Sequence, residues 1–136
     1  MTDERRQHMR KAARLLRSVE LRAESDDPDA VASTAYYAMF HAACAVLLTR
    51  SNRLPKTHST LIGQFGLIVR DLGPAGRTAG AALHEAYDRR ATGDYAVSVQ
   101  LGRKDAIAAR SAASAFIHFC KKLQRGSSDD RRQPKE

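Results

Sequence analysis

The chain has 136 residues, no tryptophan and only 6% aromatic residues, so it suits one domain in which helices approach closely through small side chains. Its net charge of +8 attracts polyanions in general but selects no particular partner. No apolar run reaches the roughly 20 residues of a bilayer crossing, and the charged start, Met1 to Arg17, lacks the apolar stretch of a secretory signal, which together indicate a cytoplasmic protein.

The first two helices are predicted from apolar spacing and from a clear break between them. The first spans about Thr2 to Glu24, with a stripe at helical spacing formed by Ala12, Leu15, Leu16, Val19 and Ala23. Asp27 and Pro28 mark the start of the second, because aspartate accepts from free backbone amides and proline fits the first helical position. This helix should continue to about Arg50, and its apolar residues nearly encircle it, which predicts the central helix of a bundle.

The next two helices follow a connector that contains Pro55. Thr57 is a candidate N-cap of a third helix, which should end before Pro74 and carries the apolar residues Leu61, Ile62, Phe65, Ile68 and Val69. A fourth helix is predicted from Pro74 to about Arg90, with Gly93 as its stop. Its small residues predict close packing against a neighbour: Gly76, Ala79, Gly80, Ala81 and Ala82.

A last helix is predicted over about residues 98–123, with an apolar stripe at helical spacing formed by Ile107, Ala108, Ala112, Ala115, Phe116 and Phe119. The polar segment after it contains no apolar residue and cannot contribute to a core. We therefore predict an all-α, four- to five-helix up-and-down bundle over residues 1–125 and a disordered tail over residues 126–136. Cys44 and Cys120 fall in apolar helical contexts without CxxC spacing, so both are expected to be buried thiols.

The clearest charge asymmetry is the stretch from Val31 to Arg70, which contains no acidic residue. Its cations are Arg50, Arg53, Lys56 and Arg70, and His58 lies just beyond the connector. Cations gathered near one loop without carboxylates predict a site for an RNA or nucleotide phosphate, with Arg53 and Lys56 as candidate ligands. A solvated basic loop would explain the same charges equally well.

A second candidate site lies at the end of the fourth predicted helix, with Arg89 and Asp94 as further candidates for binding an RNA or nucleotide phosphate. Arg89 and Arg90 are followed closely by Asp94 and Tyr95, so two cations, a carboxylate and a phenol are near one another in sequence. Arginines at this position also suit the helix dipole, and Asp94 would pair with either of them in a purely structural role.

One other pair of chemically reactive side chains invites comparison with a metal or nucleophile site. His41 and Cys44 stand three residues apart on one helical face, but no further ligand at helical spacing completes them. His8, His84 and His118 give no further pattern, so His41 is interpreted as a core histidine. We therefore expect no metal site and no cofactor.

Three blocks occur in the order and spacing of a known family: Ala35-Tyr36-Tyr37-Ala38-Met39-Phe40-His41-Ala42-Ala43, then Lys56-Thr57-His58-Ser59, and then Arg90-Ala91-Thr92-Gly93-Asp94-Tyr95. With them, over roughly Arg10 to Gln124, the chain resembles the HEPN-domain proteins. The blocks match most closely a prokaryotic branch with a YYAxFHAA helix, a later K-[ST]-H and an R-x4-Y. The resemblance implies a helical bundle, a homodimer, and pairing with a minimal nucleotidyltransferase in a toxin–antitoxin system.

The resemblance also implies RNA as a target. Catalytic HEPN domains are metal-independent ribonucleases with an R-x(4–6)-H motif, in which arginine holds phosphate and histidine activates the ribose 2′-hydroxyl. Here the block reads Arg90-x4-Tyr95, and a phenol with a pKa of about 10 is a poor general base at neutral pH. Arg53-x4-His58 fits the spacing but lies in the connector, away from the family's position.

Three functions stay open at this point. The first is a noncatalytic HEPN module that binds a nucleotidyltransferase partner, or an RNA or nucleotide phosphate, through Arg90, Tyr95, Lys56 and His58. The second is a ribonuclease toxin in which His58 or Tyr95 replaces the usual histidine and Arg90 stabilises charge on the phosphorane. The third is a purely structural interaction module whose basic surface is incidental.

Overall fold

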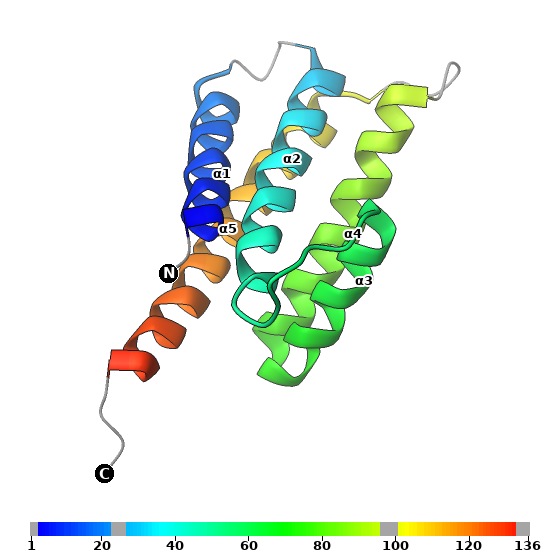
Figure 1. The fold of residues 1–136 in the computed structure, drawn as a ribbon. Helices are drawn as coiled ribbons and strands as arrows, with labels where there is room; N and C mark the ends of the chain where they lie inside the picture. Colours follow the sequence, from blue (N-terminus) through cyan, green and yellow to red (C-terminus); the bar gives the residue numbers. More distant parts are fainter. Residues whose placement is uncertain (1–2, 23–26, 96–100, 133–136) are drawn as a thin grey trace.

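The computed structural model describes residues 3–22, 27–95 and 101–132, with side chains described up to residue 92 in the second range and residue 125 in the third. Among these residues the chain forms an all-helical bundle without a β-strand (Figure 1). Its elements are α1 (Asp3–Leu21), α2 (Pro28–Leu47), α3 (His58–Val69), a 3-10 helix η1 (Arg70–Leu72), α4 (Pro74–Tyr95) and α5 (Arg103–Arg132). The predicted all-α bundle is confirmed.

Helix α2 is the central element of the bundle, as its apolar sequence predicts. It packs against α1, α4 and α5, while α3 lies mainly along α4 (Figure 1). Contrary to the reading of the sequence, α2, with 20 residues, is long and apolar enough to cross a membrane, and its most apolar 18-residue stretch has a mean hydropathy of 1.4. Two-thirds of its most apolar window is buried inside the bundle, which is what a core helix requires.

The helix starts follow the predicted capping chemistry. The Asp27 carboxylate accepts a hydrogen bond from the backbone N–H of Asp29 at 3.0 Å, and Pro28 occupies the first turn of α2. The Thr57 hydroxyl accepts from the backbone N–H of Thr60 at 3.2 Å and caps α3. The cap makes His58 the first residue of α3, which fixes the position of its side chain.

Helices α3 and α4 approach closely because glycines face the contact. A Cβ atom added at Gly76 would lie 1.9 Å from the carbonyl oxygen of Val69, and one added at Gly80 would lie 3.5 Å from the Cα of Gly66. Gly73, between the two helices, has a φ of 88°, a left-handed conformation that favours glycine. The packing role predicted for Gly76 and Gly80 is confirmed.

Three expected boundaries were wrong. Helix α4 continues through Gly93 to Tyr95, α5 begins at Arg103, and α5 continues through Gly126 to Arg132. A glycine inside a helix costs only about 1 kcal/mol relative to alanine, so a long helix can absorb it. The domain boundary at residues 125 and 126, and a disordered tail beyond it, stay predictions.

The predicted buried face of α5 was also wrong by about one position. The residues that enter the core are Ala106, Ala109, Ala113, Phe116, Ile117 and Cys120. Ile107, Ala108 and Ala115 are exposed, although all three belonged to the predicted stripe. Two adjacent faces of α5 carry alanines at helical spacing, and alanine has too little apolar surface to show which face is buried.

Candidate functional site

Six side chains from three helices meet in one place, which we call the aromatic cluster: Tyr36, Tyr37 and Phe40 on α2, His58 on α3, and Tyr87 and Arg90 on α4. On each helix these residues lie at spacings that share one face. The cluster therefore depends on the packing of α3 and α4 against α2.

His58 is held in the aromatic cluster by two contacts. Its ring stacks on Phe40, with 4.3 Å between ring centroids and an interplanar angle of 19°. Its Nδ1 lies 2.7 Å from the Tyr36 hydroxyl oxygen, at hydrogen-bond distance. Partial burial, followed by the charge of Arg90, lowers the pKa of His58 below its usual value. The imidazole is therefore neutral at pH 7.

The hydrogen bond between His58 and Tyr36 has two possible arrangements of its proton. Tyr36 is fully buried, and burial raises the pKa of its phenol well above the usual value, so the hydroxyl keeps its proton. If this hydroxyl donates to Nδ1 of His58, the ring proton lies on Nε2, which then acts as a donor. If Nδ1–H donates to the hydroxyl oxygen, Nε2 is a free acceptor and a potential base.

Arg90 brings a positive charge to the same aromatic rings. Its guanidinium carbon lies 5.2 Å from the ring centroid of Tyr37 and 5.9 Å from that of Tyr36, within the range of cation–π attraction. The same charge contributes to the lowered pKa of His58. The structure thus brings together Arg90 and His58, which the sequence placed in two separate candidate sites.

The remaining predicted site residues occupy less defined positions. Arg53 and Lys56 are exposed on the connector that leads from α2 into His58, and Arg89 is partly buried on α4 next to Arg90. Asp94 and Tyr95 are the last two residues of α4, and their side chains lie outside the described residues. Their roles stay predictions.

An open groove of about 580 Å³ between α3 and α4 borders the aromatic cluster at Tyr87. Its lining is mostly apolar and includes Gly63, Gly66 and Gly80, and a Cβ atom added at Gly63 or Gly66 would meet nothing within 4 Å. A cavity of this size accommodates a ligand as large as a nucleotide.

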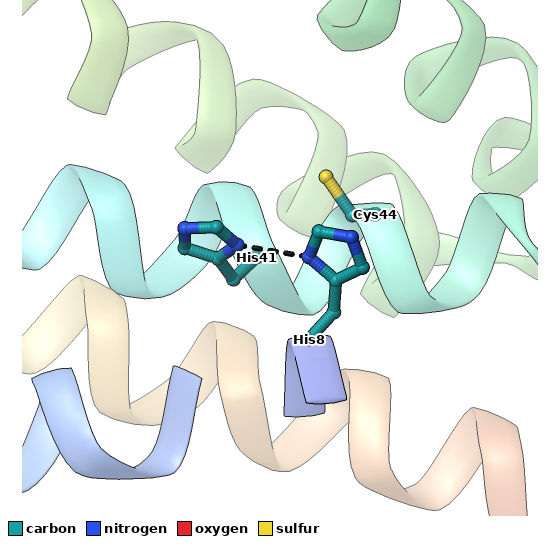
Figure 2. Close-up of side chains that lie close together, drawn as sticks. All are labelled: His8, His41 and Cys44. Carbon is teal, nitrogen blue, oxygen red and sulfur yellow. Dashed lines mark hydrogen bonds between the residues drawn. The ribbon is translucent and has the colours of Figure 1, made fainter. Parts of the chain in front are cut away.

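A second cluster, which sequence reasoning missed, joins α1 and α2 (Figure 2). We call it the histidine–cysteine cluster: His8, His41 and Cys44. Nδ1 of His8 lies 2.9 Å from Nδ1 of His41, and one potential ligand atom from each of the three residues lies within 4.8 Å of the others. His8 is 33 residues from His41, so only the packing of α1 on α2 shows that they meet.

Comparisons with known proteins found one matching family model and two similar proteins. The family model described as HEPN domain matches residues 6–123 of this chain. The chain is similar to a UPF0332 protein of Archaeoglobus fulgidus, with 33% identity over 119 residues that cover 88% of this chain and 94% of that protein. It is also similar to a protein of Methanocaldococcus jannaschii named "Putative toxin", with 43% identity over 67 residues that cover 49% of this chain and about half, 48%, of that protein.

Proposed function

This chain belongs to the HEPN domain family, and we propose that it is a noncatalytic HEPN module that binds RNA through the aromatic cluster and acts in a toxin–antitoxin system. The observation that carries the proposal is the meeting of Arg90 and His58 over the aromatic rings of α2. A cation beside partly buried aromatic rings supplies what single-stranded RNA binds, with phosphate on the cation and bases against the rings.

The charge of the surrounding chain supports a polyanionic ligand. Residues 31–70 contain no carboxylate, and Arg53 and Lys56 are exposed on the connector that leads into the aromatic cluster. The groove of about 580 Å³ beside Tyr87 adds room for a base next to the proposed phosphate site. The ligand would therefore run from the connector across Arg90 towards the groove.

The proposal is noncatalytic because it takes the arrangement in which Tyr36 donates the hydrogen bond, and His58 is then not set up as a general base. With Tyr36 donating to Nδ1, the free nitrogen of His58 carries a proton and can only donate. At the position of the family's catalytic histidine this chain has Tyr95, whose phenol ordinarily stays protonated at neutral pH. Such a site holds a phosphate without activating the ribose 2′-hydroxyl.

One observation favours ribonuclease activity as a second candidate. The fold supplies an arginine and a histidine to one site, although the histidine comes from α3 rather than from the end of α4. With the other arrangement of the Tyr36 hydrogen bond, Nε2 of His58 is an acceptor, and Arg90 would stabilise charge on the phosphorane. This alternative needs no metal and no cofactor.

The toxin–antitoxin assignment rests on family membership and on the similarity to a protein named "Putative toxin". Within it we propose a homodimer, a minimal nucleotidyltransferase as the partner, and a cytoplasmic location. Co-expression with a nucleotidyltransferase encoded beside this gene tests the partnership, because a stable complex should co-purify through size exclusion.

The binding proposal is tested by fluorescence anisotropy with a labelled single-stranded RNA. Arg90→Ala should weaken binding about tenfold, which corresponds to a loss of about 1.4 kcal/mol. Arg89→Ala removes the same charge from the neighbouring residue and should have a much smaller effect. Equal losses in the two variants, both abolished by added salt, would instead indicate nonspecific attraction to a basic surface.

A further inference from the structure

We propose that the histidine–cysteine cluster is a binding site for a borderline transition-metal cation, with Zn²⁺ as the representative ion. The site lies between α1 and α2, and its ligands are one imidazole nitrogen each from His8 and His41 and the Sγ of Cys44 (Figure 2). It adjoins the aromatic cluster, because the ring centroid of His41 lies 5.4 Å from that of Phe40, but it makes no use of Arg90. This proposal revises the expectation from the sequence that the chain has no metal site.

The positions of the three side chains suit one ion. His41 and Cys44 are three residues apart and share a face of α2, and His8 reaches them from α1. Ligands at about 2.0–2.1 Å for nitrogen and about 2.3 Å for sulfur are separated from one another by roughly 3.3–3.6 Å around a tetrahedral ion. The potential ligand atoms lie within 4.8 Å of one another, so side-chain rotations have to bring them to the separation that the ion requires.

The chemistry of the donors narrows the choice of ion. Two imidazoles and a thiol suit Zn²⁺, Co²⁺, Ni²⁺ or copper, whereas Mg²⁺ and Ca²⁺ prefer sets of oxygen ligands. Three protein ligands leave a fourth position for water or for the carboxylate of Glu4, which lies one helical turn before His8. The charge of Glu4 affects the pKa of both His8 and Cys44.

The two histidines already have the protonation state that a metal requires. Burial, followed by the neighbouring His8, Lys11, Arg14 and His58, lowers the pKa of His41 to about 4. Burial is also the main cause of a lowered pKa at His8, where Glu4 opposes it. Both imidazoles are therefore neutral at pH 7 and can offer a nitrogen lone pair to a cation.

Cys44 must lose a proton when the metal binds. Burial, together with the charge of Glu4, raises the pKa of its thiol to about 12, so the sulfur is protonated in the metal-free chain. Binding forms the metal–sulfur bond and releases this proton to solvent, with no change of oxidation state. The affinity should therefore increase with pH, and the positive charges of Lys11 and Arg14 oppose the cation at every pH.

The test uses the full chain, freed of metal with a chelator and titrated with Co²⁺ and then with Zn²⁺. A thiolate ligand gives Co²⁺ an intense charge-transfer absorption in the near ultraviolet, which Zn²⁺ should abolish by displacement. We expect one ion per chain. Cys44→Ala should remove the charge-transfer band. His8→Gln should weaken the affinity on the order of a hundredfold, because loss of a residue that only hydrogen-bonds to a metal ligand already costs about 10–100-fold.

Two matched controls separate this site from general metal binding. His84→Gln removes an exposed histidine on α4, and Cys120→Ala removes the other buried thiol, and both should retain the band and the affinity. Far-ultraviolet circular dichroism checks that each variant is folded. His8→Gln is the variant least expected to disturb the core, because the His8 side chain is partly exposed. If Co²⁺ gives no thiolate band, or if His8→Gln and His84→Gln bind it equally, the cluster is a hydrogen-bonded histidine pair beside a buried thiol and the proposal is overturned.

Discussion

The guanidinium carbon of Arg90 on α4 lies 5.2 Å from the ring centroid of Tyr37 on α2. This contact places a cation over an aromatic surface, and the same charge reaches His58 at the start of α3. Three consecutive helices, α2, α3 and α4, thus contribute to one candidate RNA site. Its properties can be tested one side chain at a time.

The first prediction concerns the proton between Tyr36 and His58. Tyr36→Phe removes the hydroxyl that lies 2.7 Å from Nδ1 and should cost about 1 kcal/mol of stability. If the hydroxyl donates to neutral His58, its loss should raise the pKa of His58, because a bond that favours the neutral form has gone. NMR titration of the His58 ring measures this pKa. A lowered pKa would indicate that Nδ1–H is the donor and would strengthen the ribonuclease alternative.

The second prediction concerns the pH dependence of stability. The pKa of His41 is about 4 in the folded chain and about 6.5 when unfolded, so the unfolded chain binds more protons between these values. The contribution of neutral His41 is present above pH 6.5 and should be lost progressively as the pH falls towards 4. Urea unfolding in EDTA should show this decline in the free energy of unfolding between pH 6.5 and 5 for the native sequence. The decline should be smaller for His41→Gln, and for the control His84→Gln it should equal that of the native sequence.

The third prediction tests the close approach of α3 and α4. Gly76→Ala places a Cβ atom 1.9 Å from the Val69 carbonyl oxygen, so the start of α4 has to shift. We expect a loss of about 3 kcal/mol in the free energy of unfolding. Gly63 lies inside α3, and a Cβ atom added there meets nothing within 4 Å. Gly63→Ala should therefore stabilise the chain by about 0.5–1 kcal/mol. Similar effects of the two variants on thermal unfolding would contradict the described packing.

The fourth prediction tests which face of α5 is buried. Ala113 is fully buried, so Ala113→Asp introduces an unpaired charge into the core and should cost about 3–5 kcal/mol. Ala115, two residues further along, is exposed, and Ala115→Asp should change stability by less than about 0.5 kcal/mol. Circular dichroism and urea unfolding of the two variants measure the difference. The reverse order would restore the face predicted from the sequence.

Capping residues and apolar patterns predicted the helices well, because both depend only on residues within or next to a single helix. Asp27 and Thr57 were identified as caps from their residue types, and the apolar composition of α2 identified the central helix. The buried face of α5 could not be predicted, since its alanines follow two faces with the same spacing. Gly93 was expected to end α4, but one glycine is too weak a signal against a helix stabilised by packing.

The sites depend on contacts between helices, and the sequence gives only part of that information. The resemblance to HEPN proteins pointed to both Arg90 and His58, yet their meeting follows from the packing of α3 and α4 on α2. For the histidine–cysteine cluster the sequence paired His41 with Cys44 but gave no signal for His8, which lies 33 residues before His41. To place His8 beside His41, one would have to predict which faces of α1 and α2 are in contact.

The central claim is that the aromatic cluster binds RNA without cleaving it. The most direct test incubates end-labelled single-stranded RNA in EDTA with the native chain, Arg90→Ala and His58→Ala, and follows both binding and the appearance of 2′,3′-cyclic phosphate ends. We predict that the native chain binds intact RNA and that Arg90→Ala binds it about tenfold more weakly. Cleavage by the native chain that is lost in His58→Ala would contradict the noncatalytic assignment and identify a metal-independent ribonuclease.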